Sequence, residues 1–338
     1  MLKGILFAAL FLLINVKAPA QQKRFSFTEP KMGSPFKIVF YANDSMQATN
    51  LAKHCFNLVD SFIFIFSDYT ESSELGRLNA SANDGSQPAM ASPALIDILT
   101  LSKTAFEKTG GAFDITIGPL VKLWRKARKS KQFPAMQAVR SARSLVGFNN
   151  LIIDTVNKKI TMSKPGMQLD LGGIAQGYIA QKIIDFLRTL QIDNALVDAS
   201  GDIVMSGPPP GYIGWTVGIN VPEATDELLS RPLLMQNKAV TTSGDVYQFM
   251  ENAGKRYSHI IDPRTGYGVT SQRNVTAIAD NGVTADWLAT ACSILPVRKA
   301  KRLAVQMGAE VLIAEIRKGK LIFTSTKGFG QYWKPAVQ

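Results

Sequence analysis

The chain has 338 residues, of which 46% are apolar and 19% are charged, and its formal net charge is +12. This composition excludes a disordered or fibrous chain, and the length exceeds one ordinary hydrophobic core, so we expect two closely packed lobes or one large domain. Cys55 and Cys292 could pair in an oxidising compartment, but two cysteines make no disulfide framework, and buried free thiols are the expectation. With only two histidines, His54 and His259, and no C-x-x-C, the sequence argues against a His/Cys zinc site.

The N-terminus has the pattern of a secretory signal peptide over residues 1–20. Lys3 precedes an apolar run at residues 5–16, and Ala18-Pro19-Ala20 gives a small-residue cleavage site. The run is shorter than the roughly 20 residues that span a membrane. We therefore expect an exported, periplasmic protein whose folded domain is residues 21–338. Without cleavage, the same segment would anchor the chain in the inner membrane.

Basic residues gather in the middle of the chain. They are Lys122, Arg125, Lys126, Arg128, Lys129, Lys131, Arg140 and Arg143. Nucleic acid is not expected as a partner, because the protein is exported and few aromatic residues interleave with these charges. The pattern favours a solvated helix or loop face, and attraction to an anionic membrane surface or an acidic partner is the second interpretation.

Apolar periodicity and capping residues predict the elements in chain order. Helices are expected at residues 47–62, from Ser92-Pro93 to Gly110, and at 174–190, 284–295 and 296–307. Strands are expected at residues 36–41, 151–153, 159–162, 195–197, 203–205, 215–220, 275–279, 311–316 and 320–325. Strands and helices alternate in no strict order, which predicts an α+β fold with mixed sheets and packed helices.

Residues 258–266 place an imidazole, a carboxylate and a guanidinium close together. Ile260 and Ile261 suggest the end of a strand that stops at Pro263, followed by a turn in which Gly266 is free to take positive φ. By itself this segment favours a surface turn with His259 at a strand end.

Two further patterns suggest phosphate and metal chemistry. Residues 170–177 are expected to run from a strand end through two glycines into a helix, an arrangement that can bind an anion but also fits a plain turn. Asp286 and Thr290 lie four residues apart on an expected helix, so their oxygens share one face and suit Mg²⁺. The alternative is an Asp that favours the helix dipole beside a packed Thr.

Three shorter segments leave their roles open. Asp202 and Asp245 each follow Ser-Gly after an expected strand, where either carboxylate could cap a turn. Residues 112–116 follow a Gly pair, where Phe113 and Asp114 could flank a planar ring or simply start a strand.

Taken together, these segments resemble the FAD:protein FMN transferase family, the ApbE-type flavin transferases, over nearly the whole expected mature chain. The matching motifs are residues 32–34, 66–69, 73–75, 77–79, 111–120, 170–178, 200–202, 242–245, 259–266 and 285–290. Three positions depart from the family pattern. Ser34 stands where Thr is usual, Gln176 where Lys or Glu is frequent, and Gly201 follows Ser200 where a second Gly is common.

The resemblance implies a Mg²⁺-dependent enzyme that cleaves FAD and attaches FMN, through its phosphate, to a Thr hydroxyl of an acceptor protein, with release of AMP. It implies that the acceptor is a subunit of an exported or membrane redox complex, such as Na⁺-translocating NADH:quinone oxidoreductase or an Rnf-type system. Peripheral association of the protein with the membrane is a further option, and it rests on the basic residues in the middle of the chain.

The resemblance assigns site residues as well. The metal ligands would be Gly173, Asp286 and Thr290. The FAD would contact Met32, Tyr69, Ala112, Phe113, Asp114, Asp170, Gln176 and Ile261. His259 would be the general base, with a structural role in its turn as the alternative. An FAD pyrophosphatase and a flavin-binding protein without turnover are the competing functions; Tyr69 favours transfer over hydrolysis.

Overall fold

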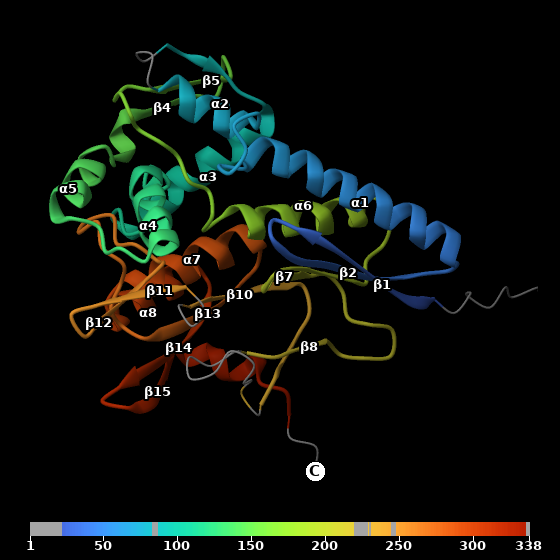
Figure 1. Cartoon of the computed structure of the whole chain (residues 1–338). Helices are drawn as coiled ribbons and strands as arrows, with labels where there is room; N and C mark the ends of the chain where they lie inside the picture. Colours follow the sequence, from blue (N-terminus) through green and yellow to red (C-terminus); the bar gives the residue numbers. More distant parts are fainter. Residues whose placement is uncertain (1–21, 83–86, 220–228, 230, 245–247, 336–338) are drawn as a thin grey trace, which may run out of the picture.

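The computed structural model describes residues 22–82, 87–219, 229, 231–244 and 248–335. An open antiparallel sheet of eight strands, in the order β1-β2-β6-β7-β10-β13-β14-β15, forms its centre (Figure 1). These strands are β1 (Lys23–Lys31), β2 (Ser34–Ala42), β6 (Ala195–Ala199), β7 (Asp202–Met205), β10 (Lys238–Gly244), β13 (Arg273–Ala279), β14 (Glu310–Arg317) and β15 (Lys320–Ser325). The expected signal peptide lies outside the described residues.

Helices cover one face of this sheet, and a small sheet lies against the other. The covering helices are α1 (Ser45–Phe66), α6 (Ala175–Thr189), α7 (Gly282–Ile294) and α8 (Val297–Gln306). On the opposite face, β8 (Trp215–Val217), β9 (Leu233–Met235) and the 3₁₀ helix η2 (Lys327–Tyr332) pack against a second apolar cluster. Alternation along the strands explains the two layers, because Val197 and Ala199 belong to the cluster beneath the helices whereas Leu196 belongs to the other.

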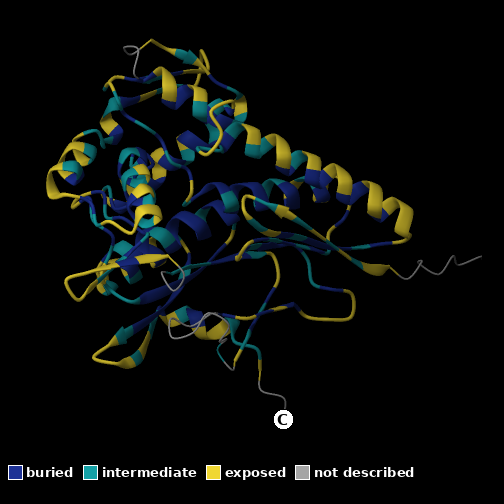
Figure 2. Ribbon diagram, viewed as in Figure 1, coloured by how far each residue is buried: buried dark blue, intermediate teal, exposed yellow. Residues whose placement is uncertain are grey.

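The remaining elements form a second lobe that is continuous with the helical layer. They are α2 (Glu74–Ser81), α3 (Pro93–Thr109), α4 (Gly118–Ser130), α5 (Met136–Ser144), η1 (Phe148–Asn150), the sheet of β3 (Ala89–Met90), β5 (Lys159–Met162) and β4 (Leu151–Asp154), and the hairpin of β11 (Phe249–Asn252) and β12 (Lys255–Ser258). One apolar cluster extends from the large sheet to Phe148 and Ile160 in this lobe, so the two parts share a core (Figure 2). The expected α+β fold of two closely packed lobes is confirmed.

Local signals placed several elements correctly. Ser92 caps α3, since its hydroxyl accepts a hydrogen bond from the backbone N–H of Leu95 at 3.2 Å, and Gly110 ends the helix with φ +58°. The turn at residues 264–266 is also present, with Gly266 at φ +80°.

Two strand predictions near the site were wrong. Ile260 and Ile261 lie beyond β12, and Ile261 makes only an isolated bridge to Gly268. Residues 112–116, where a strand start was one of two open interpretations, form turns and bends between α3 and α4. No strand leads into Asp170 either, because the side chain of Asn79 takes both the N–H and the C=O of Leu169, at 2.7 and 2.9 Å, in place of a neighbouring strand.

Within the described residues, no helix is long and apolar enough to cross a membrane. Cys55 and Cys292 are both buried and free, as expected from the sequence.

Candidate functional site

The loop of Gly172 and Gly173 meets helix α7 at Thr290. A Cβ atom placed on Gly173 would lie 3.1 Å from Thr290 Oγ1 and 3.2 Å from Cε2 of Phe113. Glycine is therefore needed for this close approach, and it brings the backbone of the loop up to the Thr290 hydroxyl. Two of the three predicted metal ligands, 117 positions apart by their numbers, are neighbours in space.

Asp286 lies one turn before Thr290, where α6 and α7 cross. The backbone N–H of Gly177 donates to Asp286 Oδ2 at 2.9 Å. A Cβ on Gly177 would overlap the carbonyl oxygen of Gly282, and a Cβ on Gly282 would overlap that of Gly177. The two glycines allow the helices to touch and bury Asp286, which is only 4% exposed.

A second carboxylate, Asp202 at the start of β7, faces the same region. Burial, followed by the charge of Asp202, raises the pKa of Asp286 well above its ordinary value. Burial likewise raises the pKa of Asp202 to about 7, and the Thr241 hydrogen bond opposes this shift. Asp202 Oδ1 is a buried atom without a hydrogen-bond partner among the described residues.

These residues fit a hard divalent cation. The described residues contain no cluster of three or more His, Cys, Asp or Glu side chains that could hold a metal. Mg²⁺ does not require one, because it binds through one or two carboxylates and other oxygens. The buried, unpartnered Asp202 oxygen and the raised pKa of Asp286 are what a site built to receive positive charge would show.

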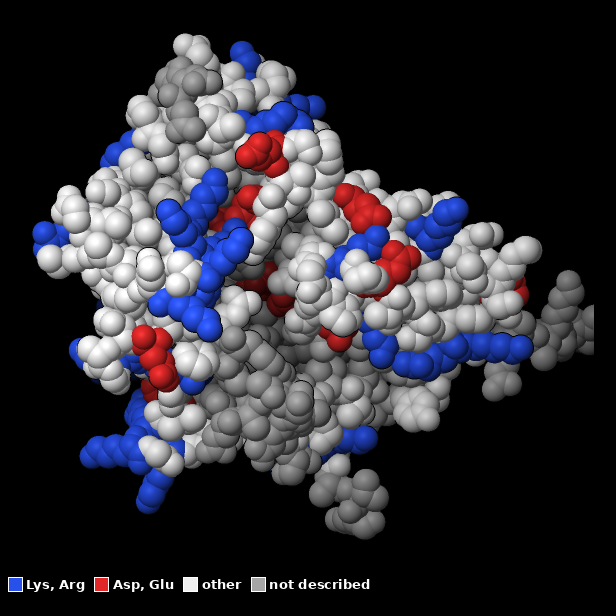
Figure 3. Space-filling view, viewed as in Figure 1, with Lys and Arg blue, Asp and Glu red and all other residues white. Residues whose placement is uncertain are grey.

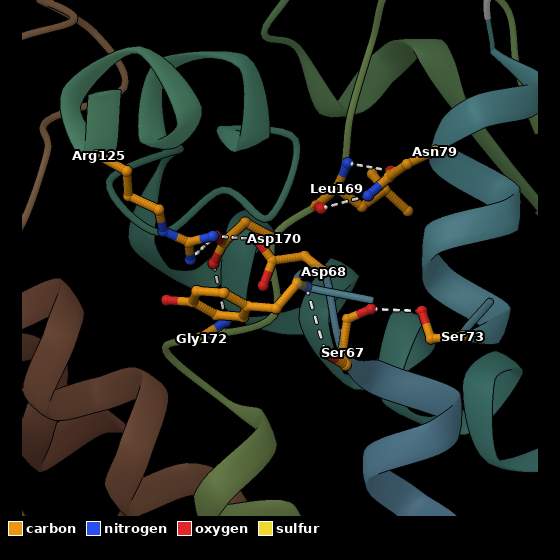
Figure 4. Close-up of polar contacts among 9 residues, drawn as sticks. Ser67, Asp68, Ser73, Asn79, Arg125, Leu169, Asp170 and Gly172 are labelled. Atoms are coloured by element: carbon orange, nitrogen blue, oxygen red, sulfur yellow. Dashed lines mark hydrogen bonds and ion pairs between the residues drawn. The ribbon is translucent and has the colours of Figure 1, made fainter. Parts of the chain in front are cut away.

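Asp170 belongs to an ion-pair network at the other side of the Gly172 loop (Figure 4). Arg125 of α4 pairs with Asp170 at 2.9 Å and also with Asp68. Burial, and then the charge of Asp68, raises the pKa of Asp170 to about 6, while Arg125 lowers it. The Gly172 N–H donates to Asp170 Oδ1 at 2.9 Å, so the network fixes the start of the glycine loop.

Arg125 also stacks on the ring of Tyr69. The guanidinium lies over the Tyr69 ring at 4.2 Å from its centroid, and this ring is 78% exposed. An exposed aromatic ring held by a buried ion-pair network offers a flat surface to a planar ligand. The run of basic residues predicted a solvated face for Arg125, and nothing in it indicated that this side chain pairs with Asp68 and Asp170.

His259 lies within reach of the positive charge of Arg128, which follows Arg125 on α4. Its Nδ1 is 3.3 Å from the carbonyl oxygen of Gln248, to which its backbone N–H donates at 2.8 Å. Burial, followed by the charge of Arg128, lowers the pKa of His259 to about 4. Burial lowers the pKa of Arg128 most, and the charge of Arg125 lowers it further. Helix α4 therefore carries both the arginine that pairs with Asp170 and the arginine whose charge acts on His259.

The β1–β2 turn contributes Met32, which is 39% exposed and has φ +53°. The Ser34 and Ser200 hydroxyls are 2.5 Å apart, so this turn is tied to the β6–β7 turn. Gln176 Nε2 donates to the carbonyl oxygen of Ala199 at 3.3 Å, which places it beside the same pair of turns.

The other predicted FAD contacts are more deeply placed. Ala112 and Phe113 are buried, and Phe113 packs against Trp287 of α7. Asp114 Oδ1 accepts hydrogen bonds from the N–H and hydroxyl of Thr116, at 2.8 and 2.6 Å. Ile261 is buried in the apolar cluster of α4. Packing explains the positions of the Ala112, Phe113 and Ile261 side chains, and hydrogen bonds with Thr116 explain the position of the Asp114 side chain.

Asp114 also lines a cavity of about 460 Å³ that is open to solvent. Its basic lining residues are Arg140, Arg143 and Arg264. Elsewhere on the surface, acidic side chains lie in a hollow beside a row of Lys and Arg side chains (Figure 3). Acidic and basic side chains thus lie close together on this surface.

The chain is similar in sequence and fold to known proteins of one family. The ApbE family profile matches residues 32–313. A FAD:protein FMN transferase of Klebsiella pneumoniae is 31% identical over 276 residues, which cover 81% of this chain and 84% of that protein. A FAD:protein FMN transferase of Vibrio cholerae is 29% identical over 96% of this chain and 94% of its own. The crystal structure of the ApbE protein of Thermotoga maritima superposes with a TM-score of 0.83 at 27% identity, covering 93% of this chain and all of the other. The resemblance drawn from the motifs is confirmed, and the chain belongs to the ApbE family.

Proposed function

We propose that this protein is a Mg²⁺-dependent FAD:protein FMN transferase, which moves FMN from FAD to a Thr hydroxyl of an acceptor protein and releases AMP. The transferase class follows from its membership of the ApbE family and from relatives that bear this name. The observation that carries the finer proposal is the meeting of Gly173, Thr290 and the buried Asp286.

The metal would be held by the carbonyl group of Gly173 and the side chains of Asp286 and Thr290. When bound, it would neutralise the charge of the FAD pyrophosphate during phosphoryl transfer. The glycine loop would let the backbone approach the pyrophosphate closely. Arg125 holds Tyr69 in place, so its exposed ring can stack on the flavin or the adenine.

His259 would remove the proton from the acceptor. A bond forms between the Thr oxygen and the phosphorus of the FMN phosphate, while the bond from that phosphorus to the bridging oxygen breaks. AMP leaves with the bridging oxygen. The depressed pKa of His259 keeps its imidazole neutral at pH 7 and able to accept a proton, although a pKa of about 4 makes it a weaker base than one with a pKa near 7.

The compartment and the acceptor belong to the same proposal. The leader at residues 1–20 supports export to the periplasm, where a subunit of a membrane or exported redox complex would carry the target Thr. FAD is the small-molecule substrate, and no nucleic acid is involved.

The test is incubation of the full chain with FAD, Mg²⁺ and a candidate acceptor, followed by mass spectrometry of acceptor peptides. We expect one FMN on a Thr of the acceptor and one AMP for each FMN attached. FMN and AMP without a modified acceptor would identify a pyrophosphatase. Unchanged FAD would identify a flavin-binding protein, and either result contradicts the proposal.

A further inference from the structure

We propose that Asp202 is an additional residue of the cation site, whose carboxylate faces the metal and supplies the second negative charge that holds it. The sequence suggested no more for Asp202 than the capping of a turn, and the ligand set of the proposed function stops at Gly173, Asp286 and Thr290. This inference rests on that proposed function and extends its site to strand β7.

Strand pairing places Asp202 on the face of the sheet that lies under the helices. Asp202 pairs with Ala199 of β6 and with Thr241 of β10. Ala199 and Val204 both belong to the apolar cluster beneath α6 and α7. Since side chains alternate along a strand, Asp202 points with Val204 toward the helices.

Helix α7 begins directly above this strand. A Cβ on Gly282, the first residue of α7, would lie 2.6 Å from Cγ2 of Val204. Asp286 follows one turn later, on the same side of α7 as Gly282, and the charge of Asp202 raises its pKa. The two carboxylates therefore face the same space between β7 and α7.

The hydrogen bonds of the hairpin do not use Asp202 as a cap. Asp198 caps this turn instead, because its Oδ1 accepts a hydrogen bond from the Gly201 N–H at 2.8 Å. Asp202 is only 7% exposed and its Oδ1 has no partner among the described residues. A buried carboxylate oxygen without a donor is costly, and a second buried carboxylate nearby adds repulsion. A divalent cation between Asp202 and Asp286 would relieve both costs.

The test compares Asp202→Asn with the wild type in two measurements on the full chain, namely the affinity for Mg²⁺ alone by calorimetry and the melting temperature with and without Mg²⁺. We expect the affinity to fall about 10–100-fold, the usual effect of removing a supporting residue of a metal site. Without metal, the melting temperature should stay the same or rise, because one of two repelling charges is gone.

Asp198→Asn is the matched control. Asp198 pairs with Ile203, so it lies on the opposite face of the same hairpin, and its loss removes the same charge. The charge of Asp198 raises the pKa of Asp202 but lies on the far face, so Asp198→Asn should change Mg²⁺ affinity far less than Asp202→Asn does. Asp286→Asn should abolish Mg²⁺ binding.

The outcomes separate the two ideas. If Asp202→Asn binds Mg²⁺ as the wild type does while Asp286→Asn does not, the role of Asp202 is refuted and the proposed function stands. If Asp202→Asn melts lower without metal, the residue is structural and the inference is wrong. A wild type that binds no Mg²⁺ would overturn the metal-dependent function itself.

Discussion

His259 is held in its neutral form by two features of its surroundings. Burial comes first, and the positive charge of Arg128 adds to it, so its pKa falls to about 4. The unfolded chain, with a pKa near ~6.5, binds a proton first as the pH drops. The contribution of His259 to stability is therefore complete above that value and is lost as the pH falls toward about 4.

Nuclear magnetic resonance can measure this pKa directly. His54 is the only other histidine, so a His54→Gln variant leaves a single imidazole signal. We expect its titration midpoint well below that of a free imidazole, and Arg128→Gln should raise the midpoint by removing a nearby positive charge. A midpoint near 6.5 in the folded protein would contradict the described environment of His259.

Removal of the imidazole separates catalysis from binding. His259→Ala should lower the rate of FMN transfer by roughly 10²–10⁴-fold, the usual effect of a positioned acid–base group. FAD affinity should fall far less, because the metal ligands and the glycine loop are untouched. Single-turnover rates and FAD titrations on this one variant decide the matter, and a parallel collapse of both would make His259 a binding or structural residue.

Residue chemistry was partly predictable from the sequence. The spacing of Asp286 and Thr290 suggested a shared helix face, and the resemblance to the family added Gly173, which lies beside Thr290 in the structure. Arg125 was missed because its partners, Asp68 and Asp170, lie 57 and 45 residues away in the sequence. A run of basic residues gives no indication of which member turns inward.

At the level of elements, the crossing of α6 and α7 sets the position of Asp286. The crossing depends on two glycines, Gly177 and Gly282, whose backbones touch. Any side chain at either position must push the helices apart, and Asp286 would move away from the Gly177 N–H.

Gly282→Ala tests this dependence. We expect a loss of about 1–3 kcal/mol in the free energy of unfolding, the usual cost of overpacking, together with weaker Mg²⁺ binding. Gly330→Ala is the control, because a Cβ there meets nothing within 4 Å. Chemical denaturation of both variants provides the measurement, and equal stability of Gly282→Ala and the wild type would show that the helices can separate without cost.

The predictability of elements followed the strength of local signals. The helix from Ser92 to Gly110 was predicted because a cap, a proline and a left-handed glycine mark its ends. The segment before Asp170 was wrongly predicted to end a strand. Its backbone pairs with the side chain of Asn79 and not with a neighbouring strand, and a single sequence does not reveal that partner. Helix α4 was not identified, since its many charges obscured the apolar positions Leu120 and Trp124.

For the whole molecule, the leader should be absent from the exported protein. The signal-peptide pattern at residues 1–20 predicts a mature chain that begins near Gln21, with a net charge of +10 after loss of Lys3 and Lys17. N-terminal sequencing of protein recovered from the periplasm checks this. A chain that starts at Met1 in the soluble cytoplasm would refute export.

The α+β class was predictable from the alternation of elements, whereas the order of the eight strands was not. Neighbours such as β7 and β10 are separated in the sequence by β8 and β9, which pack on the opposite face. Pairing between strands that are far apart in the sequence produces no periodic pattern, so a single sequence does not predict which strands are neighbours.

The open sheet has two outer strands, and they differ in how they would meet another copy of the protein. Among the described strands, β1 at one end carries Lys23, Arg24 and Lys31, and its Pro30 offers no N–H, features that discourage the addition of a foreign strand. The strand at the other end, β15, exposes Ile322 and Phe323. In concentrated solution, self-association should therefore begin at β15, and charged substitutions there should improve solubility without touching the site.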